Sequence, residues 1–180
     1  IKGFKVKAIL GGVCSSETLA MAPLAEESKV ILFSPSASHP SVSTAGDFVF
    51  RNFPSDTMQG EKLADYVTEH NLQNLVIFSD EVTTVIKDAI TSALPQTTVT
   101  HIETITGDTR LFNKSIKKFP EADGYIVDTY SATVVARALL AFQTAESTVP
   151  VLIPSMEFNN FFDTYPEFDE YNGEIAWLEA

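Results

Sequence analysis

The sequence has 180 residues, of which 44% are hydrophobic, and its 24 acidic and 12 basic side chains give a formal net charge of −12. The hydrophobic fraction excludes a disordered chain, and the acidic excess argues against a nucleic-acid partner, which requires clustered lysine and arginine. No apolar stretch approaches the roughly 18 residues that a membrane-spanning helix needs, so we expect no transmembrane segment.

The first fifty residues alternate between apolar runs and a helical pattern. The runs 6–10 and 30–33 predict buried strands, with a helix over 18–28 between them and a short strand over 47–51 after them. Pro23 lies inside this helix, so we expect a kink or a shortened helix. The single cysteine, Cys14, excludes an internal disulfide, and we expect a buried small residue or a thiol whose partner lies elsewhere.

A break at Phe53-Pro54-Ser55-Asp56 marks a change of domain, and Arg51 and Asp56 on its two sides are expected to pair. Ser131 is expected to cap one of the helices that follow. The segment 158–171, rich in aromatic and acidic residues, is expected to be a packed surface loop. The remaining predicted elements are helices over 58–70, 82–94, 110–119 and 132–143, and strands over 75–78, 98–105, 125–127, 149–153 and 174–178.

The regular alternation of strand and helix predicts an α/β fold with doubly wound parallel sheets. We divide the chain into a partial first lobe over 1–53, a crossover over 54–57, a second lobe over 58–172, and a last strand over 173–180 that returns toward the hinge. The first lobe has too few elements to bury a good core, so covering elements from elsewhere are expected. The sequence starts with Ile1 and shows no signal segment, and we interpret it as a piece of a longer polypeptide.

Two clusters of small hydroxyl residues follow the first two predicted strands. The first is Cys14-Ser15-Ser16-Glu17-Thr18, and the second is Ser34-Pro35-Ser36-Ala37-Ser38. Neighbouring parallel strands end at the same sheet edge, where open α/β sheets bind ligands. Hydroxyls and backbone N–H groups at a helix start suit an anion, and a carboxylate is the first expectation. The alternative for Ser16 is that it only caps the helix.

Three blocks of sequence, over 10–27, 34–38 and 50–60, together resemble the type I periplasmic-binding-protein family. Within that family the resemblance is to the branched-chain amino-acid (Leu/Ile/Val) binding proteins of ABC transporters. It implies a Rossmann-like, two-lobe fold, here with lobe one incomplete, whose lobes close over a ligand. It also implies a periplasmic or cell-surface location, a membrane permease as partner, and no enzymatic activity, cofactor or metal.

The resemblance assigns roles in the first lobe to three serines. Ser15 matches the residue whose hydroxyl and N–H donate to the ligand carboxylate. Ser38 matches a serine or threonine whose hydroxyl and backbone N–H hold the same group. Ser36 matches a residue whose backbone carbonyl receives the ligand ammonium.

In the second lobe the resemblance points to one aromatic and one acid. Tyr130 matches an aromatic residue that closes on the ligand, and Glu157 matches the acid that pairs with the ammonium, with Met156 as the alternative at that position. Thr83 stands where many relatives carry an aromatic-glycine pair, so one wall of the pocket differs. Because the acid is not firmly placed, a carboxylate without an amino group stays open as the ligand.

Our first hypothesis is therefore a solute-binding protein of an ABC importer, and the second is the ligand-binding domain of a membrane receptor or sensor. The third is a flavodoxin-like enzyme or regulatory domain, disfavoured because the sequence has no P-loop and no G-x-S-x-G, G-x-G-x-x-G or H-E-x-x-H motif. His39, His70 and His101 have no metal-ligand spacing. We expect this chain alone to bind weakly, or to complete lobe one through another chain.

Overall fold

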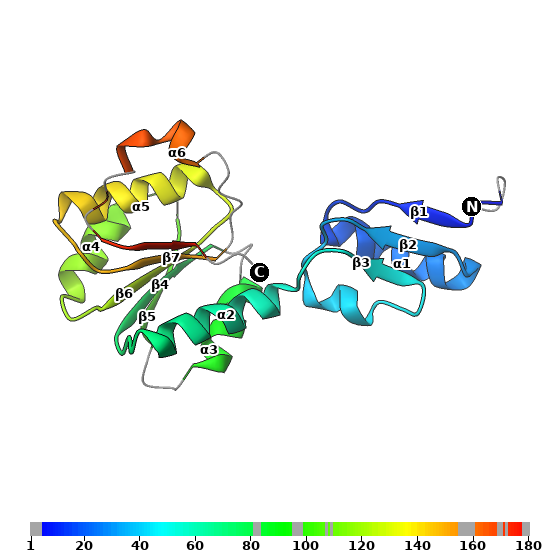
Figure 1. Ribbon diagram of the computed structural model, residues 1–180, viewed down its shortest axis with the longest axis horizontal. Coiled ribbons are helices and arrows are strands. Elements are labelled where there is room, and N and C mark those ends of the chain that lie inside the picture. Colours follow the sequence, from blue (N-terminus) through cyan, green and yellow to red (C-terminus); the bar gives the residue numbers. More distant parts are fainter. Residues whose placement is uncertain are drawn as a thin grey trace. The chain divides into compact units, whose positions relative to one another are not determined.

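A computed structural model gives the structure of the protein and describes residues 5–80, 84–94, 99–106, 108, 110–154, 161–168, 171 and 173–177. The chain divides into two compact units, unit 1 over Ile1–Met58 and unit 2 over Gln59–Ala180. Each unit has its own sheet, and every strand pairing in both sheets is parallel (Figure 1). Helices flank both sheets, which confirms the predicted α/β class.

Unit 1 holds a three-stranded sheet in the order β1-β2-β3. Its elements in chain order are β1 (Ala8–Leu10), α1 (Ser15–Ser28), β2 (Ile31–Ser34), the 3-10 helix η1 (Pro40–Thr44) and β3 (Val49–Arg51). The register places Ser34 opposite Arg51 on the neighbouring strand. Because all three strands run the same way, the loops that follow β1 and β2 leave the sheet at one edge.

The sheet of unit 1 buries only one of its faces. Leu32 and Val49 on that face pack in a small cluster with residues of α1 and η1. Alternate side chains of the same strands lie on the other face, and five of them are exposed: Ala8, Leu10, Ile31, Phe33 and Phe50. Parallel strands are normally covered on both faces. Within the described residues of unit 1, no helix covers this open face.

α1 corrects two expectations. Pro23 lies inside the helix, yet the helix continues from Ser15 to Ser28, so a shortened helix is wrong and the alternative, a kink, stays a prediction. Proline removes one backbone hydrogen bond, but Ala22 and Ala25 on either side of it are buried in the core cluster, and this packing maintains the helix. The cap is Cys14, which is exposed rather than buried, and its N–H donates to Glu17 Oε2 at 3.2 Å.

Unit 2 holds a five-stranded sheet in the order β5-β4-β6-β7-β8. The strands are β4 (Leu75–Ser79), β5 (Val99–Thr104), β6 (Gly124–Asp128), β7 (Val151–Ile153) and β8 (Ile175–Trp177). The helices are α2 (Asp56–Glu69), α3 (Thr84–Ala93), α4 (Arg110–Lys118), α5 (Ala132–Thr144), α6 (Phe161–Thr164) and the 3-10 helix η2 (Pro166–Phe168). β8 pairs with β7, so the segment that we separated as a last strand is part of the second sheet.

Helices cover both faces of the second sheet, α4 and α5 on one side and α2 and α3 on the other (Figure 1). Along β4, Val76 and Phe78 pack on the first side, while Leu75 and Ile77 pack on the second. This two-sided burial is the doubly wound arrangement that the apolar runs predicted. None of the helices described is long and apolar enough to cross a bilayer.

Two further predictions concern the ends of elements. Ser131 caps α5, because its Oγ accepts from Val134 N–H at 3.4 Å, which confirms the predicted cap. The prediction of a surface loop over 158–171 is wrong for the described part of that segment. This part contains α6 and η2, and Phe161 and Phe168 within it are buried. The two aromatic rings join the core on the α5 side, and their burial stabilises these short helices.

Candidate functional site

The two hydroxyl clusters of unit 1 lie together at the carboxyl ends of β1 and β2. Ser34, fully buried, donates its hydroxyl to the Gly12 carbonyl at 2.5 Å and accepts from Ala37 N–H at 3.0 Å. Ser36 Oγ donates to the Val13 carbonyl at 2.7 Å. Gly12 has φ +67°, and a side chain there would collide with Thr18. These contacts lock the two loops to each other.

Ser15 Oγ is the centre of this arrangement. It accepts two backbone N–H groups, from Ser38 at 3.1 Å and from His39 at 3.0 Å. A serine hydroxyl has two lone pairs and one proton. Since both lone pairs are engaged, the hydroxyl can offer only its proton to a further partner, and no acceptor for that proton occurs among the residues described. The side chain is partly exposed, so a ligand can reach it.

The other two predicted serines have different surroundings. Ser38 N–H is bonded to Ser15, which leaves its hydroxyl, and not its N–H, for a ligand. The hydroxyl of Ser36 is bonded to Val13, and this bond fixes the loop on which the Ser36 carbonyl lies. Ligand contact by each of the three serines stays a prediction. What the structure adds is that all three belong to one hydrogen-bonded edge.

Arg51 takes a role that we did not expect. It does not pair with Asp56, and its guanidinium instead donates to the backbone carbonyls of the second cluster and to Ser43 Oγ. The reason is that the N–H groups of this loop point to Ser15 and Ser34, which leaves its carbonyls for a cation on β3. Asp56 is held through its backbone, because its N–H donates to the Ser38 carbonyl at 3.0 Å.

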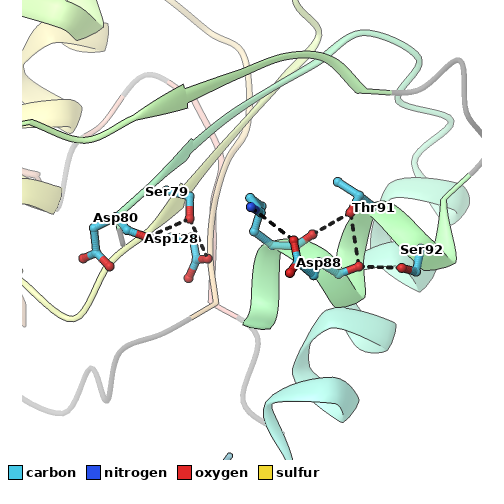
Figure 2. Close-up of polar contacts among 7 residues, drawn as sticks. Ser79, Asp80, Asp88, Thr91, Ser92 and Asp128 are labelled. Carbon is cyan, nitrogen blue, oxygen red and sulfur yellow. Dashed lines mark hydrogen bonds and ion pairs between the residues drawn. The ribbon is translucent and has the colours of Figure 1, made fainter. Parts of the chain in front are cut away.

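A second polar edge occurs in unit 2, where β4 and β6 end with Ser79 opposite Asp128. Figure 2 shows Ser79 between the Asp80 carbonyl and the Asp128 carboxylate, with distances from Ser79 Oγ of 3.2 Å and 3.5 Å. Asp128 is fully buried. Thr91 and Ser92, also drawn in Figure 2, bond back to the Asp88 carbonyl within α3. Asp80 after β4 and Asp128 at the end of β6 thus bring two carboxyl groups to this edge of the sheet.

Tyr130 lies in the turn that follows β6 and is held by its neighbours. Thr129 Oγ1 donates to Asp80 Oδ2 at 2.7 Å and accepts from Ser131 N–H at 3.2 Å. Thr129 is buried, whereas the Tyr130 side chain is 51% exposed. The turn thus presents an aromatic ring on an anchored backbone. Thr83, Met156 and Glu157 lie outside the described residues.

Sequence reasoning missed Asp128 and treated Asp80 only as a departure from a family pattern. Asp128 directly follows the buried apolar run 125–127, and Asp80 follows the run 75–78 after one residue, Ser79. That is the same signal that identified the serine clusters, so it was available in the sequence. Within the described ranges, no group of three or more histidine, cysteine or acidic residues is arranged to hold a metal ion.

The two edges differ in the chemistry that they offer. The edge of unit 1 offers hydrogen-bond donors, which suit an anion, while the edge of unit 2 offers carboxylates, which suit a cation. His39, next to Ser38, does not serve as a base for it, because its Nδ1 accepts from Ser41 N–H at 3.1 Å and caps η1. The two edges thus differ in the charge of the group that each could bind.

The sequence matches the receptor family ligand binding region over residues 1–155. No curated protein matches it.

Several solved structures have the same fold. An ABC transporter substrate-binding protein from Desulfitobacterium hafniense, in complex with Leu, is 21% identical, with a TM-score of 0.70 over 82% of this chain and 46% of that one. A branched-chain amino acid transporter substrate-binding protein from Streptococcus pneumoniae, in complex with isoleucine, is 24% identical. The match has a TM-score of 0.65 and covers 83% of this chain and 44% of that one. A solute-binding protein from Rhodopseudomonas palustris, in complex with 4-hydroxybenzoate, is 17% identical. The match has a TM-score of 0.68 and covers 84% of this chain and 44% of that one. The chain therefore spans less than half the length of these proteins.

Proposed function

Since this chain belongs to the receptor family ligand binding region and has the type I periplasmic-binding-protein fold, we propose that it binds a small carboxylate-bearing solute for an ABC importer. The observation that carries the proposal is Ser15 Oγ, whose two lone pairs are engaged by Ser38 N–H and His39 N–H. Its proton is directed outward, and a carboxylate is a strong acceptor for it. The Ser38 hydroxyl is the second proposed donor.

An amino acid is the ligand that we propose first. A zwitterion bound away from water needs partners for both charges, because an unpaired buried charge is costly. Asp80 and Asp128 at the second edge favour a ligand with an ammonium group. Solved proteins of this fold hold leucine in one case and 4-hydroxybenzoate in another, so the fold does not distinguish these ligands. Tyr130, Glu157 and Thr83 remain proposed contacts.

The proposed mechanism is lobe closure rather than catalysis. A ligand that binds more tightly to the closed arrangement of the lobes shifts the protein toward that arrangement. We place the protein outside the cytoplasm, with a membrane permease as its partner. The similar solved proteins are substrate-binding proteins, which agrees with a non-enzymatic role.

The receptor alternative is favoured by one observation, the family description itself, which names a receptor ligand-binding region. Its binding chemistry would be the same, but the output would be a signal instead of transport. Fractionation of cells that express the full-length gene product separates the two proposals. An integral membrane protein supports a receptor, whereas release with the extracytoplasmic contents supports an importer component.

Isothermal titration calorimetry on the full-length protein tests the binding proposal. We would titrate L-leucine, L-isoleucine and 4-hydroxybenzoate, with leucinol as the matched compound that lacks the carboxylate. We expect binding of at least one acid and none of leucinol. A protein that is folded and binds none of the acids, or binds leucinol equally well, contradicts the proposal.

We also propose that lobe one is completed by elements that cover the open face of the sheet in unit 1, from the same polypeptide or from another chain. The five exposed side chains on that face, and the coverage of less than half of the solved relatives, support this. The same titration on the 180-residue chain alone should then show weak binding or none. Tight binding by a monomer of this chain would contradict the proposal.

A further inference from the structure

The loop that carries Ser36 and Ser38 has its carbonyl groups turned toward one cation. Arg51 Nη1 lies 3.4 Å from the Ala37 carbonyl oxygen, 2.9 Å from that of Ser38 and 3.1 Å from that of His39. Arg51 Nη2 donates to Ser43 Oγ at 2.6 Å. One guanidinium therefore contacts three consecutive carbonyls and also Ser43 in the last turn of η1.

The N–H groups of the same loop are held by two other side chains. Ser36 and Ala37 donate to Ser34 Oγ at 3.4 Å and 3.0 Å, and Ser38 and His39 donate to Ser15 Oγ at 3.1 Å and 3.0 Å. Three side chains thus bond to the backbone of this loop: Ser34, Ser15 and Arg51. Two backbone N–H groups add to them, since Asp56 donates to the Ser38 carbonyl at 3.0 Å and Val42 donates to the His39 carbonyl at 3.1 Å. Because Ser34 and Arg51 are paired across β2 and β3, the sheet register itself brings two of the three side chains to the loop.

Converging carbonyl dipoles repel one another unless a cation lies between them. Arg51 supplies that cation, and its planar fork offers several donors in fixed directions. Without it, the Ala37 carbonyl loses its contact with Arg51, while the Ser38 and His39 carbonyls keep only the N–H groups of Asp56 and Val42. The peptide planes between residues 37 and 39 are then held less firmly and rotate more easily. Rotation of those planes withdraws the Ser38 and His39 N–H groups from Ser15.

We infer that Arg51 is a positioning residue for the ligand site: it orients the loop 36–39, and through that loop it fixes the Ser15 hydroxyl as an outward donor. The effect of Arg51 on ligand binding rests on the proposed function. The orientation of loop 36–39 by Arg51 does not depend on any ligand. A role limited to stability would weaken all ligands alike, whereas this role selects for the carboxylate.

Three variants separate these roles in the full-length protein. Arg51→Gln removes the cation and retains most of the side-chain length, and Arg51→Lys keeps the charge but not the fork. The matched control is Arg110→Gln, since Arg110 is an exposed arginine of unit 2 that pairs with Asp108 at 2.8 Å. Amide hydrogen exchange at Ser38 and His39 should rise at least about 10-fold in Arg51→Gln, less in Arg51→Lys, and not at all in the control.

The binding arm uses L-leucine and leucinol as probes. We expect Arg51→Gln to weaken leucine binding by about 10- to 100-fold, to reduce the preference for leucine over leucinol, and to be partly rescued in Arg51→Lys. Unchanged exchange at Ser38 and His39 would overturn the positioning role itself. Raised exchange with an unchanged leucine preference would overturn its link to binding. If the wild-type protein binds neither acids nor leucinol, the proposed function fails, and the exchange result still decides the geometry.

Discussion

At the scale of single residues, the site depends on where protons are directed. Ser15 accepts two N–H groups and has only a proton left to offer, whereas Ser16 follows it in α1 and is exposed. Two adjacent serines therefore differ in function although the sequence gives them the same chemistry. Substituting each serine in turn compares the effect of losing the oriented hydroxyl of Ser15 with the effect of losing the exposed hydroxyl of Ser16.

We predict that Ser15→Ala weakens binding of a carboxylate ligand by about 10- to 100-fold, because a charge-assisted hydrogen bond is lost. It should also destabilise unit 1 by about 1–3 kcal/mol, since two backbone N–H groups lose their acceptor. Titration calorimetry and urea unfolding measure the two effects. Ser16→Ala is the control and should change neither, and equal effects of the two variants would contradict the assignment.

Asp128 allows a test of which class of acid is bound. Asp128→Asn preserves the shape of the buried side chain but replaces its carboxyl group with an amide. If the ligand carries an ammonium group, leucine binding should weaken by about 10-fold while 4-hydroxybenzoate binding stays the same. Asp88→Asn, at an exposed acid of α3, serves as the control. A loss for both ligands would show that Asp128 supports the fold of the edge and not the ammonium.

At the scale of elements, apolar runs predicted the strands well. The run 30–33 became β2 (Ile31–Ser34), and the run 75–78 became β4 (Leu75–Ser79). The start of α1 was placed at 18 instead of Ser15, because its first turn is polar and its cap, Cys14, is not among the residues that usually signal a helix start. Apolar periodicity does not detect such a turn.

The short helices after β7 were missed although a signal was present. Phe161, Tyr165 and Phe168 are spaced at i, i+4 and i+7, and their rings contact one another with centroids 5.0 Å and 6.5 Å apart. The abundance of acidic residues around them favoured a loop. The aromatic spacing was the better guide, because ring burial decided the local structure.

Much of the candidate site could be predicted, but its internal bonding could not. The three serines were identified from their places after strands, whereas the bonds from Ser38 and His39 to Ser15 join residues 23 and 24 positions apart. Arg51 was assigned to the nearest acid, although its partners are carbonyls that only the folded loop brings together. Residue patterns in a sequence predict which positions are buried and where turns occur. They do not predict which backbone groups come within hydrogen-bond distance of one side chain in the folded chain.

Pro23 offers a test at the scale of one helix. Pro23→Ala should restore a backbone hydrogen bond in the exposed middle of α1 and stabilise unit 1 by about 1–3 kcal/mol. Pro40→Ala is the control, because Pro40 stands in the first turn of η1, where a proline is tolerated and no such gain is expected. Urea unfolding followed by circular dichroism measures both. A less stable Pro23→Ala protein would contradict the account given for α1.

At the scale of the whole molecule, the two units should respond differently to alkali. Burial raises the pKa of Tyr171 to about 12, and burial also raises the pKa of Tyr66 and of Tyr125. All three belong to unit 2. In the unfolded chain a tyrosine loses its proton near pH 10. The stability that these phenols contribute is therefore complete below about pH 10 and is lost as pH rises toward 12.

We predict that unit 2 loses stability between about pH 10 and 12, that Tyr171 accounts for about 1–2 kcal/mol of this loss, and that Tyr171→Phe reduces it. Hydrogen exchange of core amides in β4 and β6, measured across that range, reports it. Core amides of β2 in unit 1 serve as the internal reference. An equal response of both units, or no effect of Tyr171→Phe, would contradict the prediction.

The division into two units has a consequence for spectroscopy. Unit 1 over Ile1–Met58 contains neither tyrosine nor tryptophan, so all five tyrosines and the single tryptophan of the chain lie in unit 2. Intrinsic fluorescence therefore reports unit 2 alone, and the serine edge is spectroscopically silent. A ligand screen read by tryptophan emission could miss a molecule that stabilises only unit 1. A tryptophan introduced at Phe50, on the open face of that sheet, would give the silent unit its own reporter.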